Sequence, residues 1–473
     1  MLFNLIAPIS SFALMLSFQV AAASEPKIKL ASSKPNVVVI LTDDQSIGDV
    51  GAYGAADIQT PNIDRLAASG IRFTQFYAAA PICSPSRAGL LTGRAPERIG
   101  VPANAASFAG SLKGIPLREI TLPEMLRREG YRSALIGKWH LGYDQHLRPQ
   151  NQGFDHSFGF LVGAIDNYSH FTYWREANRH DLYRNNVETH EPGQFMPDLM
   201  VDEALNFVDE TPNGTPFFVY FALGLPHYPY QGDPHWIEYY DDQGVPYPRN
   251  LYNAFVSTMD DRIGALLDGL EARGLREDTI IIFQSDHGHS TEARAHYGGG
   301  DTQGLRGAKR SLFEGGLRVP AIISWPGTLQ SGVADQMLSS LDWMPTLADL
   351  LDADTSEIAF DGQSMTGILE DQTAPEIRNR LHWEFFEQWA VREGDWKLLY
   401  KAKDTTHGFD PAPFTGTNEL FLVNLLEDPE ESTNVSKHHP EKLSRLLAAR
   451  EAMRVKDQPR DWEIGVPVME SRP

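Results

Sequence analysis

Carboxylate and imidazole side chains follow two strongly apolar runs of this sequence. Asp43 and Asp44 come directly after one β-branched run, and Asp286 and His287 come directly after another. Two adjacent carboxylates resist joint ionisation unless a cation lies between them. An isolated Asp-Asp pair is also typical of a turn or a helix cap, but two runs that end in this way favour one convergent metal site. Oxygen ligands favour Ca²⁺ or Mg²⁺, and His287 leaves Zn²⁺ or Mn²⁺ open.

The single cysteine, Cys83, is the second feature with a chemical implication. It cannot form an intrachain disulfide, and it stands at the predicted start of a helix with Arg87 one turn later. The helix dipole and Arg87 both favour a negative charge on the cysteine side chain. A free cysteine is also common as a small buried apolar residue, but the residues around Cys83 favour the chemical role.

Alternating strands and helices are predicted to position these residues. Apolar segments typical of strands buried in a parallel sheet occupy residues 36–41, 131–136, 216–223 and 279–284. Helices are predicted from caps, first-turn prolines and stop glycines at residues 60–70, 121–130 and 253–273. This alternation predicts an α/β fold with a large, mixed, mostly parallel sheet flanked by helices.

The pattern of predicted elements changes after about residue 375. Short strand-like segments joined by polar turns are followed by a polar helix at 439–453. This pattern predicts a small C-terminal antiparallel α+β domain. We therefore expect a catalytic domain over residues 24–375 and the small domain over residues 376–473.

The N-terminal residues predict export. An apolar stretch precedes Ala21-Ala22-Ala23-Ser24, which resembles a cleavage site, so residues 1–23 are predicted to be a signal peptide of a periplasmic or secreted protein. No Lys or Arg precedes the stretch, and a membrane anchor is the alternative. The apolar core is short for an anchor and is interrupted by Pro8, and no later segment approaches the roughly 20 apolar residues of a membrane-spanning helix.

The overall charge restricts the class of partner. The chain of 473 residues carries 41 Lys and Arg against 63 Asp and Glu, a net charge of −22. Nucleic-acid binding requires a basic footprint, so this balance argues against it. An anionic substrate would be repelled by the protein as a whole, and its positive partners must therefore be local.

The segment from Cys83 to Arg94 reads CSPSRAGLLTGR and resembles the C-x-P-S-R-x-x-x-L-T-G-R pattern of the type I sulfatases at eight positions. The resemblance implies the alkaline-phosphatase-like α/β fold and hydrolysis of sulfate monoesters. In that family the cysteine is oxidised after synthesis to formylglycine, whose hydrate is the nucleophile. It also implies a partner enzyme, either a formylglycine-generating enzyme or an anaerobic sulfatase-maturating enzyme.

Further similar motifs extend the resemblance over nearly the whole mature chain. They lie at residues 137–142, 225–229, 305–320, 390–397 and 422–434. The resemblance implies that Asp43, Asp44, Asp286, His287 and Cys83 hold one Ca²⁺ ion. Many family members carry Asn at the position of His287, so Mg²⁺ or another divalent ion remains open.

The resemblance also implies roles for basic residues. The formylglycine would be the nucleophile, held by the metal and by Arg87. Lys138 and Lys309 would neutralise the sulfate oxygens. His227 would protonate the leaving oxygen, and His140 would hold the diol and accept its proton when sulfate is expelled.

A sulfated carbohydrate is the expected substrate, because the protein is predicted to be exported and carries an aromatic, polar segment between two strands. The residues expected to contact it are Tyr168, His170, Trp174, Arg175, His289, His296 and His382. The alternatives are an ordinary aromatic loop for the first four and turn capping for His289 and His296. Structural packing is the favoured alternative for His382.

Three other functions remain open from the sequence. They are a broad-specificity arylsulfatase, a phosphomonoester or phosphonate hydrolase of the same superfamily, and a non-catalytic glycan-binding protein. A dianionic phosphate ester usually goes with a second metal or another ligand set, and only one set is recognisable here. Every expected catalytic position is filled, which argues against a non-catalytic protein. The sequence predicts neither the sugar nor the oligomeric state.

Overall fold

The structure is a computed structural model of the chain, and it describes residues 34–172, 178–411 and 419–454. The predicted signal peptide, residues 1–23, lies outside the described residues, as do Trp174 and Arg175. Among the described residues, no helix is both long enough and apolar enough to cross a bilayer.

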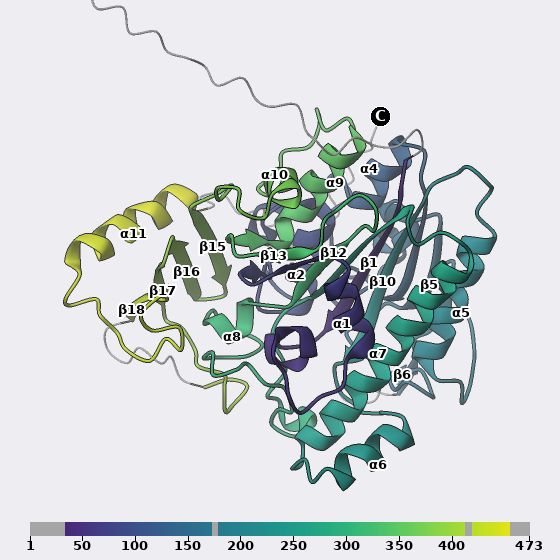
Figure 1. Cartoon of the computed structure of the whole chain (residues 1–473), viewed down its shortest axis with the longest axis horizontal. Coiled ribbons are helices and arrows are strands. Elements are labelled where there is room, and N and C mark those ends of the chain that lie inside the picture. The colour runs from purple at the N-terminus through teal and green to yellow at the C-terminus, as the bar shows by residue number, and fades with distance from the viewer. Residues whose placement is uncertain (1–33, 173–177, 412–418, 455–473) are drawn as a thin grey trace, which may run out of the picture.

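A ten-stranded mixed sheet forms the centre of the molecule (Figure 1), with the strand order β13-β2-β12-β11-β1-β10-β4-β5-β8-β9. Its strands are β1 (Asn36–Asp43), β2 (Ile71–Phe73), β4 (Arg132–Lys138), β5 (His156–Phe160), β8 (Tyr183–Arg184), β9 (Val187–Glu188), β10 (Phe217–Pro226), β11 (Thr279–Ser285), β12 (Ala321–Ser324) and β13 (Gly332–Ala334). The five strands from β11 to β5 are parallel, whereas β12 and β8 join their inner neighbours antiparallel. The predicted mixed, mostly parallel sheet is confirmed.

Two groups of helices flank this sheet. In the first, α1 (Pro61–Ala68) and α5 (Met196–Asp209) pack against α7 (Arg249–Ala272). In the second, α2 (Cys83–Thr92) packs against α4 (Leu122–Arg128) and α9 (Trp343–Leu351). All eight residues of β1 are buried between these layers, which explains its continuous run of β-branched residues.

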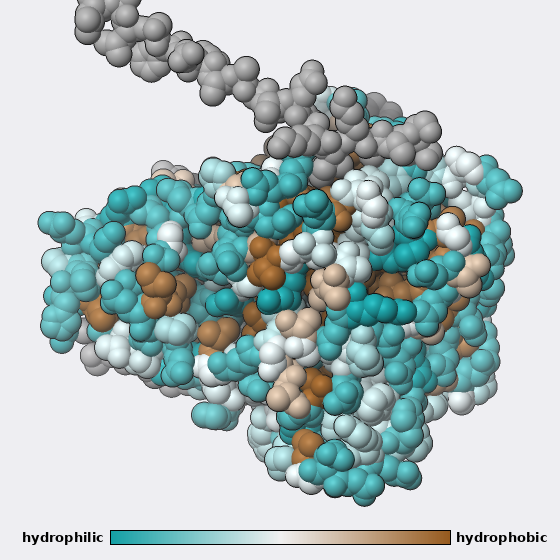
Figure 2. Space-filling view, in the orientation of Figure 1, coloured by the Kyte–Doolittle hydropathy of each residue, from teal (hydrophilic) through white to brown (hydrophobic). Residues whose placement is uncertain are grey.

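Shorter elements complete the body of the molecule. They are the strand pairs β3 (Phe76–Tyr77) with β14 (Leu338–Ser339) and β6 (Phe171–Thr172) with β7 (Arg179–His180), and the helices α3 (Pro96–Ile99), α6 (Pro234–Asp242), α8 (Glu314–Leu317) and α10 (Thr366–Glu370). On the face shown in Figure 2, hydrophilic residues predominate and hydrophobic ones appear in separate groups.

A separate four-stranded antiparallel sheet follows near the C-terminal end. It consists of β15 (Arg380–Phe385), β16 (Gln388–Glu393), β17 (Trp396–Tyr400) and β18 (Leu420–Asn424), and α11 (Pro440–Met453) covers one face. The other face packs on the main body, where the Trp383 indole donates a hydrogen bond to the Ala78 carbonyl at 2.9 Å. The predicted small antiparallel sheet is therefore present. The boundary at residues 375/376 stays a prediction.

A buried ionic cluster joins the small sheet to the main body of the molecule. The Lys397 ammonium of β17 lies 2.8 Å from Glu314 Oε1 and 3.0 Å from Glu431 Oε1, and all three side chains are buried. The Tyr77 hydroxyl of the main body donates to Glu314 Oε2 at 2.6 Å. Lys397 therefore compensates two buried carboxylates at once.

Lys397→Met is expected to lower the free energy of unfolding by about 3–5 kcal/mol, because it removes the positive charge that contacts both buried carboxylates. The matched control is Lys401→Met, since Lys401 also lies near two carboxylates but its side chain is 28% exposed. The control is expected to cost at most about 1 kcal/mol. Urea unfolding of both variants measures the difference, and equal midpoints would contradict the bridging role of Lys397.

Candidate active site

Four adjacent parallel strands, in the order β11-β1-β10-β4, end at one edge of the large sheet. The register pairs Thr42 with Ser285 and Asp43 with Pro226, so the strand ends lie side by side. Such carboxyl ends are where α/β folds place their ligands. Asp43, Asp44, Asp286, His287, His227 and Lys138 all lie at or directly after these ends.

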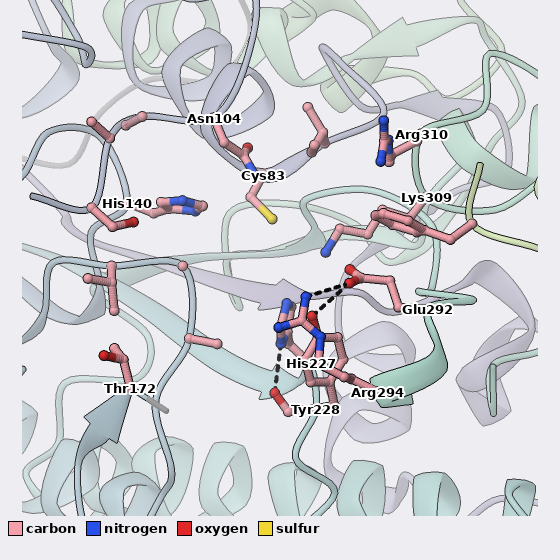
Figure 3. Close-up of a pocket in the computed structure, with 18 of the residues that line it drawn as sticks. Cys83, Asn104, His140, Thr172, His227, Tyr228, Glu292, Arg294, Lys309 and Arg310 are labelled. Atoms are coloured by element: carbon pink, nitrogen blue, oxygen red, sulfur yellow. Dashed lines mark hydrogen bonds and ion pairs between the residues drawn. The ribbon is translucent and has the colours of Figure 1, made fainter. Parts of the chain in front are cut away.

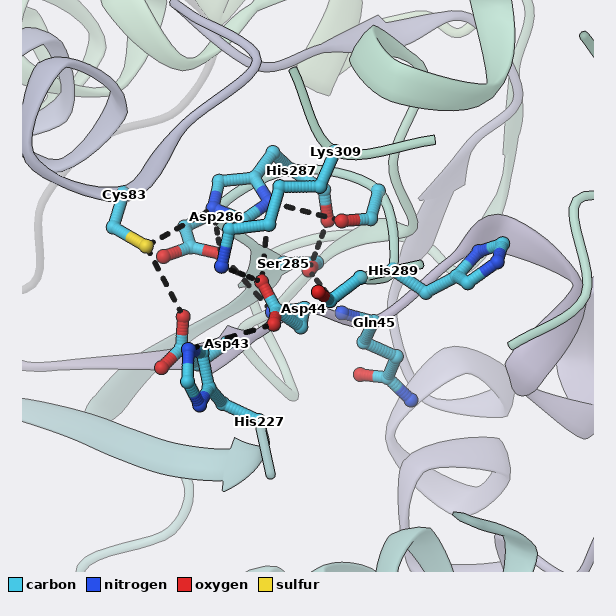
Figure 4. A network of polar contacts seen from close by, with 12 residues as sticks. Asp43, Asp44, Gln45, Cys83, His227, Ser285, Asp286, His287, His289 and Lys309 are labelled. Carbon is cyan, nitrogen blue, oxygen red and sulfur yellow. Dashed lines mark hydrogen bonds and ion pairs between the residues drawn. The ribbon is translucent and has the colours of Figure 1, made fainter. Parts of the chain in front are cut away.

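The predicted metal ligands meet at this edge, as Figure 4 shows. Asp43, Asp44, Cys83 and His287 are buried, and each offers a ligand atom within 4.8 Å of the others. His287 Nε2 lies 3.3 Å from Cys83 Sγ, and Cys83 Sγ lies 3.7 Å from Asp43 Oδ1. Asp286 Oδ1 is 3.4 Å from His287 Nε2. The structure thus brings together all five residues of the predicted set.

The start of α2 carries Cys83 into this cluster. Cys83 is the first residue of the helix, which ends at Gly93 in the left-handed conformation, where a glycine is favoured. The Ser86 hydroxyl donates to the Asp286 carbonyl oxygen at 2.6 Å, and Arg87 Nε donates to Asp286 Oδ2 at 3.0 Å. These contacts attach the first turn of α2 to the end of β11.

Two buried lysines compensate the carboxylates. Lys138 Nζ lies 2.5 Å from Asp43 Oδ2, and Lys309 Nζ lies 2.7 Å from Asp44 Oδ1. Burial raises the pKa of the Cys83 thiol, but Lys138 and Lys309 outweigh it and bring the pKa down to about 6. The cluster therefore favours negative charge on the cysteine, as the sequence predicts.

One structural observation indicates that these residues can hold a divalent cation. Asp44 Oδ2 is buried and has no hydrogen-bond partner, and His227 Nε2 lies 3.7 Å from it. Burial raises the pKa of Asp44 to about 7, because its charged form is incompletely compensated. Carboxylate oxygens of this kind are preferred by Ca²⁺ and Mg²⁺, and the imidazole of His287 also suits Zn²⁺ or Mn²⁺.

A cavity of about 360 Å³ opens above the cluster, and Figure 3 shows it from close by. Four predicted catalytic residues line it, namely Cys83, His140, His227 and Lys309. His227 Nδ1 lies 2.8 Å from the Tyr228 carbonyl oxygen, which only accepts hydrogen bonds. This contact assigns a proton to Nδ1 and leaves Nε2 as the atom that can exchange one. Lys138 and Arg87 lie beneath the cavity, against the carboxylates, and do not line it.

Tyr168 and His170 do not line the cavity, contrary to the sequence expectation. Tyr168 packs against Phe195 with ring centroids 4.9 Å apart and is 38% exposed. His170 is fully buried, with its ring 6.2 Å from that of His180. Hydrophobic packing and burial of the insert occupy these side chains instead.

Three further histidines expected at the substrate are also engaged elsewhere. His289 is buried, and its Nδ1 lies 2.7 Å from the Ser46 hydroxyl. His296 Nδ1 contacts the Tyr247 hydroxyl at 2.5 Å. His382 Nε2 lies 3.5 Å from Glu384 within the C-terminal sheet. For His289 and His296, proximity in sequence to the metal motif did not place the rings in the cavity.

The cavity wall contains residues that sequence reasoning missed. Asn104, Thr172, Arg179, Arg310 and Phe409 belong to segments far apart in the chain. Asn104 Oδ1 accepts a hydrogen bond from the Ser84 backbone N–H at 3.1 Å, next to the cysteine. The sequence carries a signal only for Arg310, which directly follows Lys309.

Comparison with known proteins gives concordant matches. A family model described as sulfatase matches residues 35–353, and one described as N-sulphoglucosamine sulphohydrolase, C-terminal, matches residues 307–453. Arylsulfatase A of Bos taurus is 33% identical over 450 residues, covering 86% of this chain and 84% of that protein. N-acetylgalactosamine-6-sulfatase of Rattus norvegicus is 36% identical over 327 residues, covering 66% and 60% respectively.

Among solved structures, the crystal structure of Ps i-CgsB superposes with a TM-score of 0.77 at 30% sequence identity. The match covers 89% of this chain and 92% of that one. The same protein has also been solved in complex with k-i-k-neocarrahexaose.

Proposed function

Because the chain belongs to the sulfatase family, the hydrolases of sulfate esters, we propose that it removes sulfate from a sulfated carbohydrate outside the cytoplasm, with Cys83 modified to formylglycine and one divalent cation bound. One observation carries this proposal. Cys83 Sγ lies on the wall of the cavity, 3.3 Å from His287 Nε2 and 3.7 Å from Asp43 Oδ1. The reactive side chain and the candidate metal ligands therefore meet where a substrate can enter.

The chemistry requires charge compensation and two proton movements. A formylglycine hydrate at position 83 would supply an oxygen nucleophile, and a cation held by Asp43, Asp44, Asp286 and His287 would supply positive charge that stabilises the transition state. Hydrolysis breaks the bond between sulfur and the alcohol oxygen, so that oxygen must receive a proton. Lys309 lines the cavity and contributes a fixed positive charge to the sulfate oxygens.

His227 and His140 are suitably placed for the two proton transfers. His227 Nε2 faces the cluster, 3.7 Å from Asp44 Oδ2. Burial lowers the pKa of His227 well below its usual value, so Nε2 must take up a proton when the anionic substrate binds, and it then donates that proton to the leaving alcohol oxygen. His140 lines the cavity and has a buried Nδ1 without a hydrogen-bond partner. It accepts the proton that the nucleophile loses when inorganic sulfate departs. Lys138 and Arg87 act from below as positioning residues, through Asp43 and Asp286.

Carbohydrate specificity and export are supported by separate observations. Similar proteins are named for N-acetylgalactosamine 6-sulfate or solved with a neocarrahexaose, and the predicted signal peptide occupies residues 1–23. Sulfate release from defined sulfated oligosaccharides, compared with nitrophenyl sulfate, tests the substrate class. Turnover confined to aryl sulfates would contradict the proposal that the substrate is a carbohydrate. A higher kcat/KM for phosphate or phosphonate esters than for sulfate esters would contradict the proposed sulfatase activity. A mature N-terminus at Ser24 in the periplasmic fraction is the expected sign of export.

His227→Gln is expected to lower kcat about 10²–10⁴-fold for a sugar sulfate, because the poor alcohol leaving group needs a proton in the transition state. Nitrophenyl sulfate releases a stabilised nitrophenolate that needs no proton, so kcat for this substrate is expected to fall much less. Steady-state kinetics with both substrates measures this difference.

The matched control is His235→Gln, because the His235 side chain is 63% exposed and does not line the cavity. The kcat values of this variant for both substrates should equal those of the wild-type protein. Equal losses of His227→Gln on the two substrates would show that His227 is not the acid.

A further inference from the structure

Two arginines line the cavity without a part in the proposed reaction. Arg179 and Arg310 both belong to its wall. Within the described part of the chain, neither forms an ion pair, because no carboxylate oxygen lies within 4.0 Å of its guanidinium nitrogens. The other charged lining residues are already paired. Lys309 contacts Asp44 at 2.7 Å, and Arg294 contacts Glu292 at 3.0 Å.

Arg179 is held rigidly by neutral groups. It lies on β7 directly opposite Thr172 of β6, which also lines the cavity. Its guanidinium stacks over the Tyr143 ring at 4.4 Å, and Nη2 donates to the Ser107 carbonyl at 2.5 Å. Nε is buried without a hydrogen-bond partner. A guanidinium has five N–H donors, so its capacity for an acceptor is largely unused.

Arg310 is held in a comparable way on another wall segment. Its guanidinium lies over the Phe409 ring at 4.5 Å. Its backbone has a φ of +71°, which is uncommon for a residue with a side chain, and its N–H donates to the Pro81 carbonyl at 2.7 Å. Strained backbone of this kind persists where the surrounding structure imposes it and is concentrated at ligand sites.

We propose that Arg179 binds a second sulfate group of the same saccharide whose first sulfate reacts at Cys83, and that Arg310, on another segment of the wall, adds positive charge to the same cavity. Stacking on an aromatic ring fixes the plane of a guanidinium but leaves its edge free, and that edge matches two oxygens of an oxyanion. The reacting sulfate does not require these two arginines, because the proposed reaction already compensates its charge with Lys309 and the cation. In a protein of net charge −22, such local positive groups must supply the attraction for a polyanionic substrate. This inference rests on the proposed sulfatase function and extends it to multiply sulfated substrates.

The test measures binding separately from turnover. In a Cys83→Ala background, which cannot hydrolyse the probe, calorimetry compares κ-type and ι-type neocarrabiose, which share one sugar backbone and carry one and two sulfates. The ι-type probe is expected to bind about tenfold or more tightly, the gain from a charge-assisted hydrogen-bond pair. Adding Arg179→Ala is expected to remove most of that preference, and adding Arg310→Ala is expected to remove a smaller part of it. Arg179→Lys, which keeps the charge but loses the planar fork, should restore it only in part.

Arg72→Ala provides the matched control. Arg72 also stacks on a tyrosine, with its guanidinium 5.1 Å from the centre of the Tyr53 ring, but it does not line the cavity. This control should keep the full preference for the disulfated probe. Equal affinities for the two probes, no binding of either, or an unchanged preference in the Arg179→Ala variant would overturn the inference. Failure of the proposed function is a different result, namely no sulfate release by the formylglycine-bearing wild-type protein from any sulfate ester.

Discussion

Cys83→Ala is expected to lower kcat/KM for every sulfate ester by at least about 10⁴-fold, because it removes the only atom from which the nucleophile can be formed. The fold should survive. Cys83 is the first residue of α2 and makes long contacts with Asp43 and His287, so an alanine methyl leaves little unfilled space. The melting temperature is therefore expected to change by less than about 4 °C.

Intact mass provides the complementary measurement on the wild-type protein. Conversion of the thiol to formylglycine lowers the mass by about 18 Da, and the fraction converted should scale with specific activity across preparations. Cys83→Ala must lack this mass change. More than a trace of turnover by Cys83→Ala, with its fold intact, would exclude Cys83 as the nucleophile.

Removal of divalent cations is expected to abolish turnover and to lower stability, because Lys138, Lys309 and Arg87 alone would then compensate the buried carboxylates of Asp43, Asp44 and Asp286. Saturating Ca²⁺ at about one hundred times its Kd should stabilise the chelated protein by about 2.7 kcal/mol. Asp44→Asn is expected to lose most of this stabilisation, because Asp44 Oδ2 is the buried oxygen that lacks a partner. Thermal unfolding with and without Ca²⁺ measures the effect independently of activity.

Asp209→Asn is the matched control for the metal prediction. Asp209 is an exposed carboxylate paired with Arg273 at 2.6 Å, far from the cluster in the sequence, and its loss should leave the Ca²⁺ response unchanged. Full activity after chelation would contradict the metal site. A full Ca²⁺ response in Asp44→Asn would place the cation elsewhere. Repeating the titration with Mg²⁺, Mn²⁺ and Zn²⁺ identifies the ion that His287 favours.

The sequence alone predicted the fold class and the proximity of the candidate metal ligands to Cys83, and one physical reason applies to both. Strand and helix patterns are local, and the rule that parallel strands end at one edge converts those local patterns into spatial neighbours. Asp43 and Asp286 follow β1 and β11, and these strands pair directly in the structure. The motif around Cys83 then supplied the family resemblance that the comparisons confirm.

The wall of the cavity was decided by the tertiary structure. Arg179, Asn104 and Phe409 come from three loops or hairpins with no shared pattern, and only packing against Tyr143, Ser84 and Arg310 brings them to the cavity. Their positions depend on many weak long-range contacts rather than on a repeating local rule. For the same reason His289 lies against Ser46 although it stands two residues after His287. The local sequence determined which groups gather at the edge of the sheet, whereas the three-dimensional packing of distant segments determined which side chains line the cavity above them.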